Sequence, residues 1–159
     1  MSDVLRTEIV SLLPRLRRFA RAIARNTHDA DDLVQTTIER ALARSEQLRA
    51  DSKPSSWLFG ILRNAWIDES RARSRRSRVL APAELADQVA DPASSNAAAG
   101  ALAIEEAMAQ LPEEQRTAVA LVLIEGLSYA EAAEVMGVPV GTLTSRLARG
   151  RATLQTMLA

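Results

Sequence analysis

The segment between Ser128 and Leu154 constrains the fold of this chain more than any other. Ser128 is followed three residues later by Glu131, a capping-box pattern that predicts the start of a helix. Gly137 suits the left-handed backbone at which such a helix ends. A second helix is then indicated by a stripe of apolar or small residues at helical spacing: Leu143, Leu147, Gly150 and Leu154. Two short helices around a glycine turn are typical of a helix-turn-helix.

The second of these helices offers polar side chains on the faces away from its apolar stripe. Short hydroxyl groups and arginines on one helix can bond to base edges in the DNA major groove and to neighbouring phosphates. The alternative is an ordinary pair of packed helices with a solvated face. The absence of any acidic residue from residues 141–159 argues against that alternative. We therefore expect DNA contacts from Thr142, Thr144, Ser145, Arg146, Arg149 and Arg151.

Composition favours helices in the rest of the chain as well. Aromatic residues make up only 3% of the sequence, and Ala, Leu, Arg and Glu favour helices packed through aliphatic side chains over sheets. Apolar residues at helical spacing predict a helix ending near Ile23, a second over about residues 30–48, and a third beginning near Ser56. Trp57 and Trp66 lie on the apolar stripe of the third helix, so we expect them in the core.

The chain divides into two helical regions. Residues 1–78 carry the first three helices. Residues 79–100 combine Ala, Pro, Ser and acids with few large apolar residues, and such a segment buries too little surface to order itself. Residues 101–159 hold the second helical group. We expect an all-α protein with two small helical domains joined by a flexible linker.

The charges of the chain are segregated, although their formal sum is zero. Five arginines lie within residues 71–78, whereas residues 81–114 contain seven acids and no Lys or Arg. Binding to nucleic acid depends on where charge lies along the chain and not on the sum. The arginine tract therefore favours phosphate contacts over a merely solubilising surface.

Several function classes are disfavoured by what the sequence lacks. Without cysteine there is no disulfide, zinc–thiolate site or thiol nucleophile. The sequence shows no glycine-rich phosphate loop, no signal peptide and no apolar run of membrane-spanning length. The single histidine, His28, lies beside Asp29, Asp31 and Asp32, a pattern more typical of a capped turn than of a metal site. We expect a cytoplasmic protein that is not an enzyme and that needs no metal, cofactor or membrane.

Three segments together resemble the extracytoplasmic-function class of bacterial sigma factors, group 4 of the sigma-70 family. Residues 29–42 (DADDLVQTTIERAL) resemble the region 2 helix that docks on RNA polymerase. Residues 55–73 resemble the helix that engages the minus-ten promoter element, and residues 111–154 resemble region 4, which reads the minus-thirty-five element. The resemblance covers nearly the whole chain. It implies core RNA polymerase and promoter DNA as partners, an anti-sigma factor as a regulator, and a role in a stress response.

The resemblance also implies roles for individual residues. Residues 12–26 are similar to the branch of the family that serves the alphaproteobacterial general stress response. The chain departs from the family at Thr144, where Lys or Arg is common. Contacts with the minus-ten strand are expected from Lys53, Ser55, Ser56, Arg63 and Asn64, and phosphate contacts from Arg71, Arg73, Arg75 and Arg76. Contacts with the polymerase clamp are expected from Asp31, Asp32, Gln35, Thr36 and Arg40.

Two other functions remain open on the sequence. An ordinary helix-turn-helix regulator would bind duplex DNA without polymerase and use its first helices to dimerise or to sense a signal. A sigma-like module would keep the fold in order to capture an anti-sigma protein, without supporting transcription itself. The intact arginine tract and second helix of the helix-turn-helix would be unnecessary in such a module.

Overall fold

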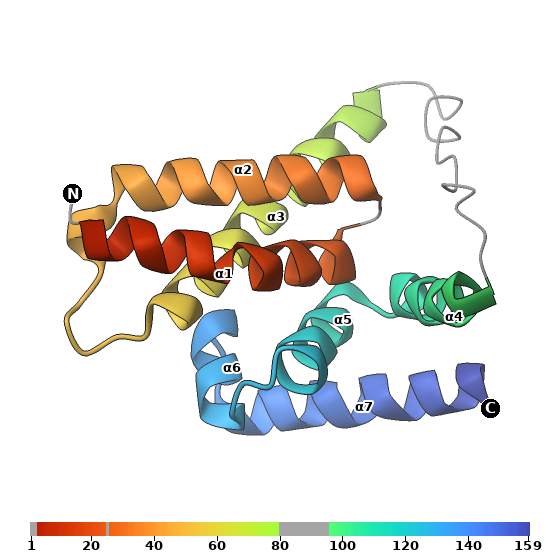
Figure 1. Ribbon diagram of the computed structural model, residues 1–159. Coiled ribbons are helices and arrows are strands. Elements are labelled where there is room, and N and C mark those ends of the chain that lie inside the picture. Colours follow the sequence, from red (N-terminus) through yellow and green to blue (C-terminus); the bar gives the residue numbers. More distant parts are fainter. Residues whose placement is uncertain (1–2, 25, 80–95) are drawn as a thin grey trace.

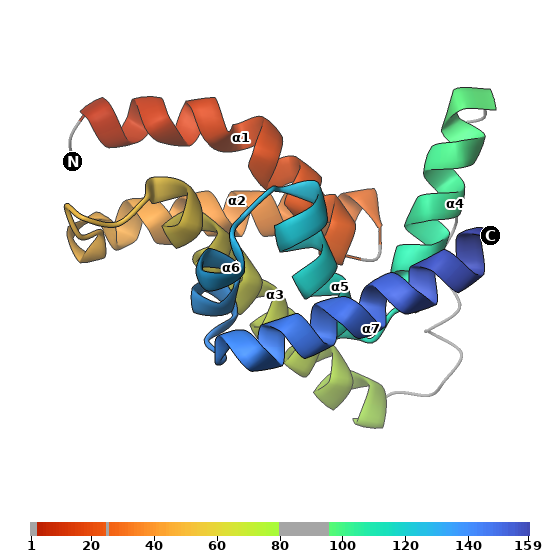
Figure 2. The same cartoon turned by 90° about the horizontal axis from the view of Figure 1, so that it is seen from below.

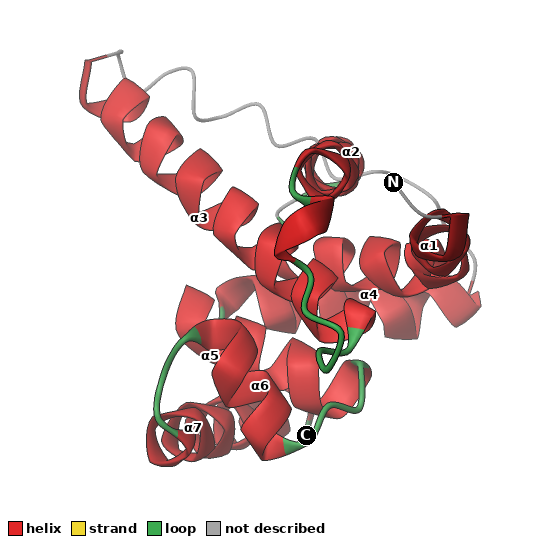
Figure 3. Ribbon diagram, turned by 90° about the vertical axis from the view of Figure 1, so that its left-hand side faces the viewer, coloured by secondary structure: helices red, strands yellow, loops and turns green. Residues whose placement is uncertain are grey.

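The computed structural model describes residues 3–24, 26–79 and 96–159, and within these ranges every regular element is helical (Figure 1, Figure 3). A short 3-10 turn, η1 (Ser45–Gln47), follows α2, and one π-helical turn, η3 (Ala120–Ile124), continues α5. The expected all-α fold is confirmed. The α-helices are α1 (Asp3–Ile23), α2 (Thr27–Ala43), α3 (Pro54–Val79), α4 (Asn96–Gln110), α5 (Glu113–Val119), α6 (Tyr129–Met136) and α7 (Val140–Leu158).

Some helix bounds differ from those that the sequence pattern predicts. The helix α2 begins at Thr27 because the Asn26 side chain accepts the backbone N–H of Asp29 at 2.8 Å and caps the helix. It ends at Ala43, earlier than the apolar pattern indicates, and the chain continues into the 3-10 turn η1. Residues 80–95 of the expected linker lie outside the described residues, while residues 96–100 belong to α4. The domain boundaries stay a prediction.

Helices α1, α2 and α3 enclose an apolar core. The rings of Phe19 and Phe59 meet edge to face with centroids 5.2 Å apart, a favourable aromatic geometry. Leu58 and Leu62 are fully buried beside them. Trp66 is 3% exposed, which confirms it as a core residue. Trp57 is only partly buried and packs against the same core.

The C-terminal helices form the expected helix-turn-helix. Ser128 Oγ accepts the backbone N–H of Glu131 at 3.1 Å, and a Glu131 carboxylate oxygen accepts the backbone N–H of Ser128 at 3.1 Å, so the capping box is complete. Gly137 ends α6 with φ +66°. On α7, Leu143 and Gly150 are buried as the stripe predicts. Local sequence signals therefore determine this motif.

The two helical groups pack directly against each other. Helices α5 and α6 lie between the α1–α3 group and α7 (Figure 1, Figure 2). The helix α1 contacts α4, α5 and η3, and α3 contacts α6. The structure is therefore a closed arrangement, by which we mean this direct packing of the N-terminal group, α1–α3, on the C-terminal group, α4–α7.

The π-helical turn η3 changes which side chains face this contact. The backbone N–H of Glu125 donates to the carbonyl of Ala120, five residues back, at 2.9 Å. Leu123 and Ile124 remain 50% and 37% exposed, whereas Glu125 is 6% exposed. A π-helical turn shifts the side chains that follow it around the helix axis, and such turns occur frequently at functional sites. Here the turn places a carboxylate in the interior and leaves leucine and isoleucine outside.

The close approach of α7 to α5 generates a stability prediction. A Cβ added at Gly150 would lie 2.8 Å from Val119 Cγ2. The Val119 side chain is buried, so it cannot move aside without a loss of packing. We expect Gly150→Ala to lower the free energy of unfolding by about 1–3 kcal/mol through overpacking, measured by chemical denaturation. Gly141→Ala, on the same helix in open space, is the control and is expected to stabilise by about 0.5–1 kcal/mol. Equal stability of the two variants would contradict this packing.

Candidate nucleic-acid interface

The helix α7 presents the residues expected to read DNA beside its buried stripe. Leu143 and Leu147 are 0% and 2% exposed, and α7 packs on α5 and α6. Thr142 and Arg146 are half-buried on the flanks of the helix. The other four expected residues are exposed: Thr144, Ser145, Arg149 and Arg151. The structure thus leaves an open polar and basic face on α7, which we call the α7 face.

Two residues of this set already have partners within the chain. The Thr144 hydroxyl donates to the carbonyl of Val140 at 2.9 Å, which leaves its oxygen able to accept a hydrogen bond. A terminal nitrogen of Arg146 lies 3.3 Å from a carboxylate oxygen of Glu114 on α5. The exposed Arg149 and Ser145 are therefore better placed for base contacts than Arg146.

Residues expected near the minus-ten strand gather at the start of α3, but two of them face the C-terminal group. Ser55 and Ser56 are half-buried in the first turn of α3. Asn64, further along the same helix, is exposed. Lys53 Nζ donates to a carboxylate oxygen of Glu131 on α6 at 3.1 Å. The pKa of the Glu131 carboxyl is lowered, first by its bond from the Ser128 backbone and then by Lys53.

Arg63 of α3 is the second of these residues. Burial lowers the pKa of its guanidinium, and the positive charge of Arg146 lowers that pKa further, while Glu113 and Glu114 oppose the effect. Arginines expected to contact two separate promoter elements thus lie near each other in the closed arrangement. Sequence reasoning assigned them to separate domains and did not foresee this.

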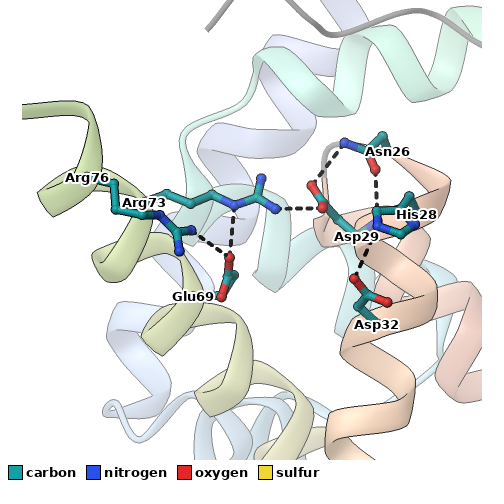
Figure 4. A network of polar contacts seen from close by, with 7 residues as sticks. All are labelled: Asn26, His28, Asp29, Asp32, Glu69, Arg73 and Arg76. Carbon is teal, nitrogen blue, oxygen red and sulfur yellow. Dashed lines mark hydrogen bonds and ion pairs between the residues drawn. The ribbon is translucent and has the colours of Figure 1, made fainter. Parts of the chain in front are cut away.

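In the arginine tract at the end of α3 some side chains have partners within the chain and others are open; Figure 4 shows two that have partners, Arg73 and Arg76. The guanidinium of Arg73 donates to Asp29 at the start of α2 and, at 3.1 Å, to Glu69, and it lies 5.9 Å from the centre of the Trp66 ring. The bond from Arg73 lowers the pKa of the Asp29 carboxyl, against the opposing effect of burial. Arg76 donates to Glu69 at 3.2 Å. Arg71, Arg75 and Arg78 are exposed, so of the four arginines expected to contact phosphate, Arg71 and Arg75 are the most open to it.

The residues expected to face the polymerase clamp gather at a groove between α2 and α3. The groove has a volume of about 470 Å³, and carboxylates from both helices line it, among them Asp68 and Glu69. Arg40 donates to Asp68 across it at 3.1 Å. Trp66 also lines the groove, and its buried indole Nε1 has no hydrogen-bond partner among the described residues. Four of the five expected residues line this groove: Asp32, Gln35, Thr36 and Arg40; Asp31 is exposed on the same helix outside it.

Sequence reasoning missed the acid at the contact between the two helical groups. The side chain of Glu125 has 0% exposure. Arg18 of α1 donates to both of its carboxylate oxygens at 2.8 Å, which raises the pKa of Arg18. Arg15 donates to a carboxylate oxygen at 3.3 Å and to the Glu125 carbonyl at 3.0 Å. An acid directly after an apolar run was the available signal, but it does not reveal partners more than a hundred residues away.

A second missed residue is Arg116 of α5, which is 6% exposed. Its guanidinium donates to three main-chain carbonyls, those of Met108 at 3.1 Å, Leu111 at 3.1 Å and Ile23 at 2.8 Å. The last of these lies at the end of α1. Carbonyls at helix ends lack partners within their own helix, so an arginine is well suited to them.

Other kinds of site find little support in the part of the chain that the structure describes. His28 and Asp32 form an exposed pair at 3.4 Å, and no three acids or histidines of the described residues come together as metal ligands would. Within residues 3–24, 26–79 and 96–159, every helix is too short or too polar to span a bilayer.

Two family models match the chain. "Sigma-70, region 4" matches residues 101–154, and "Sigma2 domain of PhyR" matches residues 9–63. The sigma factor EcfG of Rhodopseudomonas palustris is 37% identical over 158 residues, which cover 99% of this chain and 87% of the relative. SigM of Mycobacterium tuberculosis is 39% identical, covering 91% of this chain and 71% of the relative. SigW of Bacillus subtilis is 32% identical, covering 84% and 77%.

Solved structures share the fold. The sigma factor RpoE from Bartonella quintana, in complex with the anti-sigma factor NepR, matches 99% of this chain and 98% of its own with a TM-score of 0.83 at 32% identity. Superposing one helical group alone would align only about half of the chain, so a score this high requires both groups to superpose together. CnrH, in complex with the cytosolic domain of CnrY, matches with a TM-score of 0.73 at 24% identity. The order of segments, the helix-turn-helix and these relatives agree, and the chain belongs to the extracytoplasmic-function sigma factors of the sigma-70 family.

Proposed function

We propose that this chain binds core RNA polymerase and directs it to specific promoters, in a stress response under the control of an anti-sigma factor. It acts in the cytoplasm, without a cofactor and without catalytic activity of its own, as two helical domains over residues 1–78 and 101–159. The relatives that match along most of the chain are RNA polymerase sigma factors. A sigma factor of similar structure is bound by an anti-sigma factor.

The observation that carries the proposal is the placement of the three expected residue sets on three different surfaces. The α7 face offers hydroxyl and guanidinium groups of the kind that read base edges. The start of α3 offers Lys53, Asn64 and nearby serines to a single strand. The groove between α2 and α3 offers carboxylates to a basic partner surface. One chain with three such surfaces suits a protein that joins polymerase to two promoter elements.

The direct test is run-off transcription with core RNA polymerase and genomic promoter fragments. We expect specific transcripts only when the chain and the polymerase are both present. Sequence-specific binding without polymerase, and no transcripts, would instead identify an independent helix-turn-helix regulator.

One finding favours a second candidate, a sigma-like module that captures an anti-sigma protein. The model that matches residues 9–63 is described as the sigma2 domain of PhyR, and a PhyR from Bartonella quintana is an anti-anti-sigma factor solved in complex with the anti-sigma factor NepR. Binding of an anti-sigma protein without any transcripts would support this module. The exposed arginines of α7 favour the promoter-binding function, because a capture module has no need of a base-reading face.

Arg149 on the α7 face is expected to carry sequence preference. Replacing an arginine that makes paired bonds to a base costs about 1–3 kcal/mol and relaxes preference at that position. We expect Arg149→Ala to weaken binding of the polymerase complex to fragments with the native minus-thirty-five element, measured by competition against fragments with that element scrambled. An equal loss on native and scrambled fragments would contradict base reading by Arg149.

Arg75 in the arginine tract is expected to act on phosphate alone. It is exposed on α3, and a protein that neutralises one phosphate fewer has a salt slope smaller in magnitude by about 0.9 on duplex or about 0.7 on single-stranded DNA. We expect Arg75→Ala to weaken binding equally on all promoter sequences, with a shallower dependence on salt concentration. A change of sequence preference would count against this role.

The groove between α2 and α3 is expected to bind the polymerase clamp. The Asp32 side chain is 66% exposed, and its ion pair is with the exposed His28, so charge reversal there leaves the core intact. We expect Asp32→Lys to weaken affinity for core polymerase by roughly ten-fold or more through like-charge repulsion, measured by fluorescence titration. Asp51→Lys, in the exposed loop before α3, is the matched control. Equal affinity of the two variants would exclude Asp32 from the contact.

A further inference from the structure

The closed arrangement engages residues that the proposed function needs elsewhere. Lys53 donates to Glu131 of the helix-turn-helix, and the charges of Glu113, Glu114 and Arg146 act on the guanidinium of Arg63. By the positions in their names, the minus-ten and minus-thirty-five elements lie about 25 base pairs apart, which is roughly 85 Å at 3.4 Å per base pair. A compact chain of this length is only about 40 Å across. The closed form therefore cannot hold both elements at once.

One of the contacts between the two groups is centred on a carboxylate, beside the Lys53–Glu131 bond and the bond of Arg116 to the Ile23 carbonyl. Glu125 has no exposed side-chain surface, and its two oxygens receive bonds only from Arg15 and Arg18 in the described residues. A buried ion pair adds little net stability, because desolvation of both charges offsets their attraction. Removing one partner is costly, since a buried charge is left alone. Such a pair favours one specific arrangement of the two groups. Because its net stabilisation is small, another protein that binds either group can replace it.

We infer that Glu125, Arg15 and Arg18 form an ionic latch that holds this sigma factor in a closed state unable to span a promoter, and that polymerase binding requires the latch to open. The inference rests on the proposed function. An anti-sigma partner that binds the closed state shifts the equilibrium between closed and open molecules toward the closed form, and a polymerase that binds the open state shifts it toward the open form. The two partners therefore compete. The Bartonella sigma factor bound to NepR supports this, because both helical groups of the present chain superpose on it together.

Fluorescence energy transfer measures the closure directly. The chain has no cysteine, so Asp51→Cys and Glu134→Cys place one dye on each side of the Lys53–Glu131 contact at exposed positions. We expect Glu125→Gln to raise the ratio of open to closed molecules by about ten-fold or more, a shift that loss of a single charge partner can produce. Glu106→Gln, exposed on α4, is the matched control and should transfer as the parent does. Unchanged transfer in the Glu125→Gln chain would overturn the latch.

A double-mutant cycle guards against a folding defect in that variant. The Arg18 side chain is 52% exposed on α1, so Arg18→Gln opens the contact without a new group in the core, and circular dichroism verifies the helix content of each variant. We expect Arg18→Gln and Glu125→Gln together to open the chain less than the sum of the single changes, because either change alone already breaks the pair. Additive effects would show that the two residues do not act as a pair and would overturn the latch.

Binding assays separate the latch from the proposed function. The Glu125→Gln chain should bind core polymerase more tightly than the parent does, by a factor no larger than the rise in the open fraction. Equal polymerase affinity with a changed open fraction would overturn the link between opening and polymerase binding. Closure that depends on Glu125, in a chain that yields no transcripts with polymerase, would leave the ionic contact standing and refute the proposed function.

Discussion

A buried guanidinium joins the ends of two helices that lie far apart in the sequence. Arg116 of α5 donates to the carbonyls of Met108 and Leu111 at the end of α4 and to that of Ile23 at the end of α1. A buried arginine is tolerated only when such acceptors surround it. These bonds tie α5 to the end of α4 and to the end of α1, and so help to set how the C-terminal group lies against α1. The orientation of the helix-turn-helix relative to α3 depends on this arrangement.

The charged residues of the chain serve two different purposes, and burial distinguishes them. Arg15, Arg18 and Arg73 hold helices together through carboxylates. Arg75 and Arg149 are exposed and available to a ligand. The formal charge of the chain is zero, and some of its acids form ion pairs with some of its arginines. The arginines that remain exposed define the surfaces where an anion can bind. Counting arginines along the sequence does not separate these roles.

The parts of the fold that the sequence predicts are those set by neighbours within a few residues. The capping box of Ser128 and Glu131 and the left-handed Gly137 are local, and both are observed. The burial of Trp66 follows from helical spacing. The bond of Arg73 to Asp29 and that of Lys53 to Glu131 join residues 44 and 78 positions apart, and no periodicity reports such pairs. The candidate residues were thus predictable by type and position, while their partners depend on tertiary packing.

The π-helical turn η3 has a consequence for how this protein can vary. Its extra residue turns Glu125 toward α1, since the N–H of Glu125 bonds five residues back to Ala120. Deleting one residue in this turn would restore ordinary helical spacing and rotate the carboxylate by about 100°, one residue's step around a helix of 3.6 residues per turn. The helix-turn-helix itself would keep its sequence and its capping box. A single insertion or deletion in this turn, remote from the DNA-binding face, would therefore change whether a relative adopts the closed arrangement. Its base-reading residues would stay identical.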